Sequence, residues 1–382
     1  MKASDTQIFK FLEGSKQFCV PLFQRTYSWK KEQLQRFWND LEGTNIEGEI
    51  THFFGSFVTL PIHTLPSTIP KYIIVDGQQR LVTISLFLSL LRNKIAEIDE
   101  KSKIKDEIYD YYLVNKYYEN PEDKYKIIPT QADRDIFFSI IDQLHYKPEL
   151  ENRHLIAEAW RFFKKQLSEL NNLEQCRVIK NKILRKFSVV DICLEHDDDP
   201  YLIFETLNAT GSPLTQSDLI RNYLFMKTKI DHQQKVYDII WYPMQQQLRD
   251  HLEPFLRHYL AMDGSIPSFR KIYLTFKKYA DNTAKTEDSI IELMKDLNKF
   301  SQYYFRFLFP ENESESKLCE MFEIIRRLEI STCYPFLLCL YEDYANQRLS
   351  LEDFFEILKI IETYIVRRAV YGIPTAALNR YF

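Results

Sequence analysis

Residues 76–80, which read Asp-Gly-Gln-Gln-Arg, combine an acid, a glycine and three hydrogen-bond donors at one point of the chain. They follow an apolar, β-branched run that predicts a strand, and apolar residues then recur at helical spacing. Gly77 allows a sharp turn between the two elements, and the first N–H groups of the helix have no partners within it. Gln78, Gln79 and Arg80 would add side-chain donors to these N–H groups. An ordinary turn needs only the glycine, so we interpret this corner as a phosphate site.

A second group of polar and aromatic residues lies earlier in the chain, in residues 20–29. Gln24 and Arg25 stand there between aromatic residues, at a predicted junction of a strand and a helix. The guanidinium of Arg25 could hold a phosphate with two parallel hydrogen bonds, while Phe23 or Tyr27 stacks on a base. A surface arginine beside core aromatic residues explains the same pattern equally well.

The third group, in residues 201–215, could supply a metal site. Glu205 and Asn208 are three positions apart, so on a helix they share one face. Two oxygen ligands of this kind suit a Mg²⁺ ion that keeps several of its waters. A helix end, with Asn208 or Gly211 in the left-handed conformation, explains the residues without a metal.

These groups need a scaffold, and the chain is long enough for two globular units. It has 382 residues, of which 45% are hydrophobic and 15% aromatic, which suffices for two cores. Sequence patterns predict strands at residues 18–23, 52–60, 71–75 and 188–194, a short extended piece at 124–129, and helices at 5–15 and from a cap at Ser28 to residue 41.

Helical periodicity dominates the remaining sequence, so we predict an α+β fold that is predominantly helical. A small mixed sheet near the N-terminus should belong to a domain at residues 1–226, with a helical insertion at about 99–184. Residues 227–382 contain no convincing strand and should form a separate helical domain.

Bulk composition limits the class of protein. A net charge of -4 does not predict nucleic-acid binding, although basic residues cluster locally, for example at Arg367 and Arg368. No apolar run is long enough to span a bilayer, and no secretory signal opens the chain. The six scattered cysteines lack metal-ligand spacing and fit reduced thiols. We therefore expect a cytoplasmic protein.

Together the three groups resemble the N-terminal, GmrS-like domain of GmrSD-type restriction endonucleases, which also occurs in phosphorothioate-sensing SspE proteins. The family pattern V-P-x-[FY]-Q-R-x-Y-x-W, F-G-S, I-V-D-G-Q-Q-R-L and F-x-x-L-N-x-x-G-x-x-L-T-x-x-D-L-I is matched, in order, by residues 20–29, 54–60, 74–81 and 204–220. A segment like the helical end of the family follows at 364–375, so the resemblance covers essentially the whole chain.

The resemblance implies a ParB/sulfiredoxin-like core that binds and hydrolyses a nucleoside triphosphate (NTP) with Mg²⁺ or another divalent cation. The implied catalytic residues are Asp76, Gln78, Gln79 and Arg80; the implied nucleotide-binding residues are Gln24, Arg25, Tyr27, Gly77 and Asn208; and the implied metal ligands are Glu205 and Asn208. The metal pair is similar to the Glu-Asn box of ParB-like folds, a more distant relative.

The implied role is a sensor module of a type IV-like restriction and anti-phage system directed at modified DNA. Longer family members carry an HNH-type nuclease domain, and the eight histidines here show no such motif, so we expect a separate nuclease domain or subunit to cut. A homo-oligomer is compatible with the sequence. Two alternatives stay open: a nucleotide-gated DNA clamp or adaptor that does not hydrolyse its ligand, and phosphotransfer to another acceptor.

Overall fold

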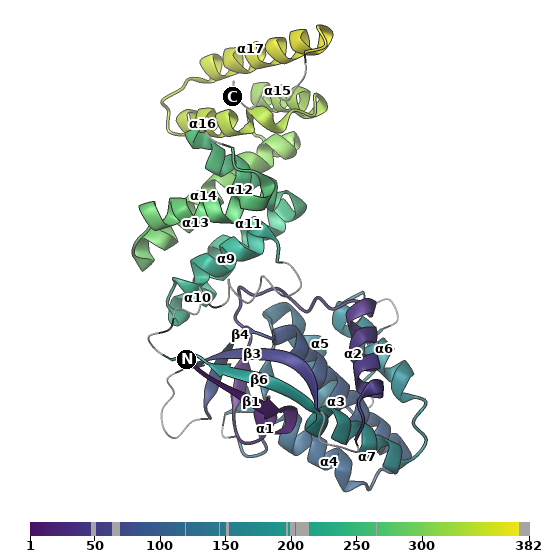
Figure 1. The fold of residues 1–382 in the computed structure, drawn as a ribbon. Coiled ribbons are helices and arrows are strands. Elements are labelled where there is room, and N and C mark those ends of the chain that lie inside the picture. The colour runs from purple at the N-terminus through teal and green to yellow at the C-terminus, as the bar shows by residue number, and fades with distance from the viewer. Residues whose placement is uncertain are drawn as a thin grey trace. The chain divides into compact units, whose positions relative to one another are not determined.

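The computed structural model describes residues 1–46, 51–62, 69–118, 120–144, 146–149, 153–195, 198, 203, 214–264 and 266–373. It divides into two compact units, Met1–Pro213 and Leu214–Phe382, which we call the first and second units (Figure 1). The fold is α+β and mostly helical, as predicted. Our predicted boundary after residue 226 lies at the end of a helix of the second unit and stays a prediction.

The sheet of the first unit is mixed and has six strands in the order β1-β6-β3-β4-β2-β5. The strands are β1 (Lys2–Gln7), β2 (Gln17–Cys19), β3 (His52–Ile62), β4 (Lys71–Asp76), β5 (Ile127–Ile128) and β6 (Phe187–Cys193). β1 pairs antiparallel with β6 and β3 with β4, whereas the other neighbours are parallel. The strands predicted at 52–60, 71–75 and 188–194 are thus confirmed as β3, β4 and β6. The extended piece at 124–129 contributes β5.

Three predictions near the N-terminus were wrong. Residues 5–15 are not one helix, because β1 pairs with β6 along its whole length and leaves only α1 (Ile8–Leu12) helical. The extended run at 18–23 ends with β2, and a turn follows in which the N–H of Gln24 donates to the carbonyl of Pro21. Ser28 does not cap the next helix, α2 (Lys31–Gly43), which begins after Lys30.

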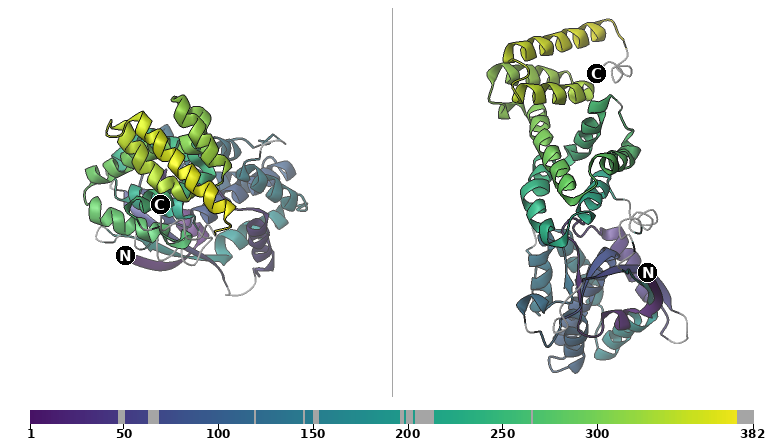
Figure 2. Two further views of the ribbon diagram at one scale, coloured as in Figure 1. Left: turned by 90° about the horizontal axis from the view of Figure 1, so that it is seen from above. Right: turned by 90° about the vertical axis from the view of Figure 1, so that its left-hand side faces the viewer.

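One long helix, α3 (Gln78–Ile98), forms the centre of the first unit. Sixteen of its 21 residues are buried, on all sides, as expected of a helix inside a core. Short helical turns at Pro121–Asp123 and π-helical turns at Tyr109–Leu113 and Lys182–Lys186 accompany α4 (Lys103–Ile108), α5 (Gln131–Asp142), α6 (Leu155–Leu167) and α7 (Leu173–Asn181). These helices pack around α3 on one side of the sheet (Figure 2).

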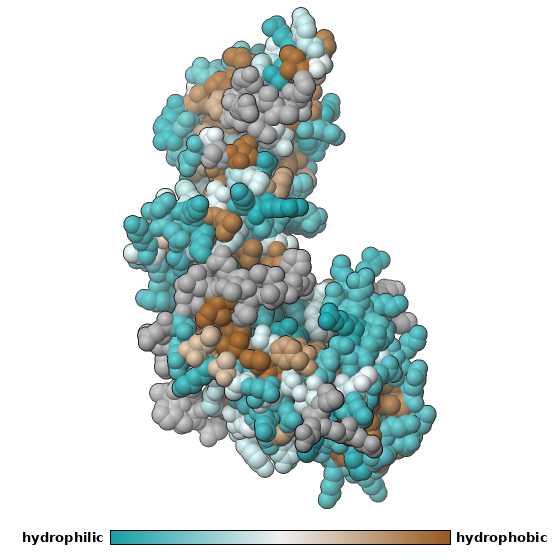
Figure 3. Space-filling view, in the orientation of Figure 1, coloured by the Kyte–Doolittle hydropathy of each residue, from teal (hydrophilic) through white to brown (hydrophobic). Residues whose placement is uncertain are grey.

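Helices and short helical turns are the regular elements among the described residues of the second unit. The helices are α9 (Gln216–Met226), α10 (Ile230–Val236), α11 (Tyr242–Leu248), α12 (Leu252–Leu260), α13 (Ile272–Thr283), α14 (Glu287–Leu308), α15 (Ser316–Arg327), α16 (Tyr334–Ala345) and α17 (Leu351–Val370), with shorter turns at Tyr237–Trp241, Arg249–His251, Ala261–Asp263, Phe269–Lys271, Pro310–Asn312 and Ser331–Cys333. Among the residues described, no helix combines the length and the apolar character needed to cross a membrane. In the view of Figure 3, hydrophilic side chains dominate the surface of the first unit over α2 and α6.

Candidate functional site

The turn between β4 and α3 can only be made by glycine. Gly77 caps the helix with φ 93° and ψ 2°, a conformation that other residues adopt at a cost. A Cβ atom at this position would lie 2.4 Å from Cδ1 of Phe57 and 2.9 Å from the carbonyl oxygen of Ser56. β3 runs beside β4 and brings these two residues against the turn. The predicted strand, turn and helix at 72–98 are therefore confirmed.

Arg80 is fixed over this turn by residues of β3. Its Nη2 donates to the carbonyl oxygen of Ser56 at 2.6 Å and lies 3.0 Å from Oδ2 of Asp76. The guanidinium carbon lies 5.9 Å from the centre of the Phe57 ring. Gly55 makes room for it, because a Cβ there would lie 3.1 Å from the guanidinium carbon. Arg80 is therefore held in one place and still about a quarter exposed, at 26%.

One donor of this arginine is not satisfied. Nε of Arg80 is buried and has no hydrogen-bond partner among the described residues. A buried polar group without a partner typically costs about 1–3 kcal/mol, and such groups in native proteins usually have an explanation. The arginine therefore has a free donor as well as its charge.

The start of α3 is also left open. No side chain caps it, no acidic residue lies in its first turn, and the first N–H known to bond within it belongs to Leu81. Gln78, at the first helical position, is half-buried and makes no side-chain hydrogen bond to any described residue. The positive end of the helix dipole and the Arg80 charge thus act at the same corner.

The two other amides that we predicted for the site, Gln24 and Gln79, turn inward. Nε2 of Gln24, a residue only 4% exposed, donates to the carbonyls of Ile74 and Val75 at 2.9 and 3.0 Å. This amide therefore ties the loop after β2 to the end of β4.

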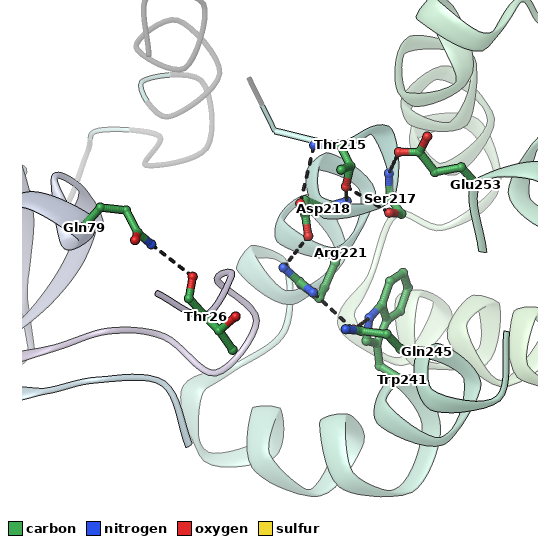
Figure 4. A network of polar contacts seen from close by, with 9 residues as sticks. All are labelled: Thr26, Gln79, Thr215, Ser217, Asp218, Arg221, Trp241, Gln245 and Glu253. Carbon is green, nitrogen blue, oxygen red and sulfur yellow. Dashed lines mark hydrogen bonds and ion pairs between the residues drawn. The ribbon is translucent and has the colours of Figure 1, made fainter. Parts of the chain in front are cut away.

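Gln79 makes a second tie between the same two segments. Its Oε1 accepts from the N–H of Ser28 at 2.8 Å. Its Nε2 donates to the carbonyl of Thr26 at 3.2 Å, a bond that Figure 4 shows. Residues 20–29 and 76–80 are thereby brought together, which is what the family resemblance implies for these two segments.

The comparison with known families agrees with this geometry. A family model described as the GmrSD restriction endonuclease N-terminal domain matches residues 8–225, more than half of the chain. The chain belongs to this family. It is therefore a component of a restriction and antiviral defence system. No curated protein matches the chain.

In this GmrSD-family chain Tyr27 packs inside the first unit and contacts α3. It is 3% exposed, its hydroxyl lies 2.8 Å from Oγ1 of Thr83, and its N–H donates to Oδ2 of Asp133 at 2.8 Å. Burial raises the pKa of the Tyr27 hydroxyl far above its usual value. The ring as placed cannot stack on a base at the surface. Arg25 lies half-buried in the same loop.

Only part of the third sequence group, residues 201–215, lies within the described residues. Glu205, Asn208 and Gly211 lie outside the described residues, so their predicted roles stay predictions. The rest of the family pattern starts α9, which Thr215 caps through its side chain. The family match therefore continues past residue 213, where the first unit ends, into the first helix of the second unit.

Sequence reasoning missed the partners of Arg80. Gly55, Ser56 and Phe57 hold it. Ser56 acts through its backbone carbonyl oxygen and Gly55 by having no side chain, so their residue types do not reveal these roles. The F-G-S element of the GmrSD family pattern was the available signal, and the structure gives it a physical reason.

The family resemblance also implies a divalent cation. No group of three His, Cys, Asp or Glu residues that could hold a metal occurs within the described part of the chain. Mg²⁺ commonly takes one or two carboxylates together with substrate phosphates and waters. Asp76 fits this requirement, because Arg80 contacts only its Oδ2 and Oδ1 makes no bond to a described residue.

Proposed function

We propose that this GmrSD-family chain binds and hydrolyses a nucleoside triphosphate at the corner formed by Gly77, Gln78, Arg80 and Asp76. In this proposal it is the sensor module of a restriction system directed at modified phage DNA. The family supports the setting, and the open helix start supports the ligand class, since backbone N–H groups at a helix start favour phosphates.

The observation that carries the proposal is the state of Arg80. The guanidinium is positioned by Ser56 and Asp76, and its buried Nε lacks a partner among the described residues. A phosphate oxygen would satisfy that donor and neutralise the charge with a short, strong hydrogen bond. An arginine that served only the fold would have its donors satisfied within it.

The residues of the corner suit phosphoryl transfer, which depends on positioning and on stabilisation of charge. Arg80 and the N–H groups of the first α3 turn hold the terminal phosphates. Gln78, whose side-chain amide is not engaged by the described residues, orients the water whose oxygen attacks the γ-phosphorus as the bond to the β-phosphate oxygen breaks. Asp76 would hold Mg²⁺, which when bound supplies positive charge to the phosphates.

Arg80→Ala tests the assignment. Removal of one preorganised donor typically lowers the rate by about 10²–10³, so phosphate release with each of the four common NTPs should fall by at least that factor. Arg177→Ala is the matched control, because Arg177 is 53% exposed on α7 and pairs only with the exposed Glu174. Circular dichroism should show both variants folded. Turnover of Arg80→Ala within twofold of the wild type would exclude this site.

A nucleotide-gated clamp or adaptor is the second candidate. It is favoured by one observation: Asp76, the only acid among the described residues of the corner, is already ion-paired with Arg80, so the described corner holds no unpaired carboxylate that could take a proton from water. Binding of a triphosphate that weakens in Arg80→Ala, without phosphate release in the wild type with or without DNA, would identify this function. Binding to DNA itself should weaken steeply as salt is raised, because phosphate contacts release counterions.

A further inference from the structure

A hollow of about 240 Å³ lies in the first unit at the other end of α3. Among the described residues it is formed by the second half of α3, by α6 and by Leu144, Tyr146 and Lys147. The residues that matter for its chemistry are Asn93, Lys94, Tyr146, Lys147, Trp160 and Lys164. Lys94 follows Gln78 by sixteen positions, so at a rise of about 1.5 Å per residue the hollow is roughly 24 Å from the start of α3. It is a separate site.

The hollow carries an excess of positive charge. Lys94, Lys147 and Lys164 line it, and Glu97 is the one acid among its described lining residues. Glu97 pairs loosely with Lys164, at 3.8 Å, whereas Lys94 and Lys147 form no ion pair with any described residue. Such a concentration of unpaired lysines stands out in a chain whose net charge is -4, and it favours an anionic ligand.

Part of the wall of the hollow is apolar and aromatic, and it contains a polar group that has no partner among the described residues. Trp160 is 8% exposed, and its Nε1 has no hydrogen-bond partner among the described residues. Lys164 places its Nζ 5.1 Å from the centre of the Trp160 ring, so lysine and indole already form one surface.

Asn93 adds an oriented amide to this wall. It is 7% exposed, and its Oδ1 accepts from Nε and Nη2 of Arg92 at 3.3 and 3.2 Å. Arg92 is itself held by the carbonyl of Ile141 at 2.6 Å. The amide is therefore fixed, and its Nδ2 is left without a bond to a described residue.

We propose that this hollow binds one nucleotide unit, with the base against Trp160 and the phosphate on Lys94 and Lys147. Flat rings bind well to aromatic side chains, and lysines suit phosphate. The volume is below the roughly 300–1,000 Å³ of sites for larger ligands, which fits a single base. The unit comes from a free mononucleotide or from a DNA strand whose base has left the stack.

The test compares the binding of nucleotides by the double variant Lys94→Gln/Lys147→Gln with that of its parent. Binding of deoxynucleoside monophosphates is measured by calorimetry, and binding of a labelled single-stranded oligonucleotide by fluorescence anisotropy. The parent protein and every variant in this test carry Arg80→Ala, so that the proposed triphosphate site does not contribute. The double variant should bind at least about tenfold more weakly, since a hydrogen bond to a charged group is worth about that factor or more. Lys165→Gln is the matched control, because Lys165 neighbours Lys164 on α6 but does not line the hollow.

Loss of mononucleotide binding in the double variant identifies a free nucleotide as the ligand, and loss confined to the oligonucleotide identifies a strand. Equal affinity of the double variant and its parent for both probes would overturn the proposal, as would an equal loss in Lys165→Gln, which would indicate general charge attraction. Failure of the triphosphate site alone leaves this result unchanged, because Arg80 is absent throughout.

Discussion

Two helix starts carry residues of the family pattern, and they are completed in opposite ways. At α9 in the second unit, Oγ1 of Thr215 accepts from the N–H of Asp218 at 3.1 Å, and Asp218 accepts in return from the N–H of Thr215 at 3.4 Å. At α3 in the first unit, Gly77 offers no side chain and no acid lies in the first turn.

The arginines near these two starts differ in the same way. Arg221 on α9 is 5% exposed, lies 2.7 Å from Oδ1 of Asp218 and donates to Oε1 of Gln245 at 3.1 Å, and Nε1 of Trp241 donates to the same oxygen (Figure 4). Arg80 is more exposed and keeps a buried donor without a described partner. The α9 start is completed by side chains of the protein and is structural, whereas the described residues leave the α3 start open, as the proposed ligand site requires.

The largest effect on stability should come from Gly77→Ala. Left-handed backbone costs a non-glycine residue about 1–2 kcal/mol, and the clash with Phe57 and the Ser56 carbonyl adds overpacking of about 1–3 kcal/mol. We expect the free energy of unfolding of the first unit to fall by the sum of the two, about 2–5 kcal/mol, measured by urea denaturation.

Gly264→Ala is the matched control for this prediction. Gly264 has φ 92° and ψ 2°, nearly the values at Gly77, but a Cβ there meets nothing within 4 Å. It should lose only the backbone part, about 1–2 kcal/mol. Equal losses in the two variants would mean that β3 does not press on the turn.

Next in size is the contrast between the two arginines. Arg221→Ala leaves the Asp218 carboxylate and Gln245 without their buried partner, and breaking such a pair typically costs about 3–5 kcal/mol. Arg80→Ala should cost less than about 1 kcal/mol, since its ion pair is partly exposed. The unfolding of the second unit can be followed by the fluorescence of Trp241, the one tryptophan beyond residue 213. If Arg80→Ala lowers the free energy of unfolding by as much as Arg221→Ala does, Arg80 is a structural residue and the case for a ligand is weaker.

The sequence predicted the strand, turn and helix of the corner better than it predicted the pairing of β1 and the direction of the side chains. Strand, turn and helix at the corner followed from a β-branched run, a glycine and helical periodicity, each a local signal. β1 was missed because it is a polar, exposed edge strand whose pairing with β6 leaves no apolar pattern. The inward direction of Gln79 was also missed. α3 is buried on all sides, so its helical phase does not show which of the neighbouring amides faces the core.

The smallest effect on stability belongs to Gln78→Glu, which separates the two interpretations of the open helix start. The change adds a negative charge in the first turn of α3 and breaks no bond to a described residue. Interaction with the helix dipole should raise the free energy of unfolding by about 0.3–1 kcal/mol. If phosphates bind at the same place, the added charge repels them, and the Kd for a non-hydrolysable triphosphate should rise by about tenfold.

Gln166→Glu on α6 is the control for net charge, because it adds the same charge in the same unit away from the start of α3. If only Gln78→Glu gains stability and loses affinity for the triphosphate, the open start of α3 serves the ligand and lowers the stability of the protein. Unchanged affinity in Gln78→Glu would place the phosphates elsewhere. Weaker binding in both variants would show only that the protein as a whole attracts anions.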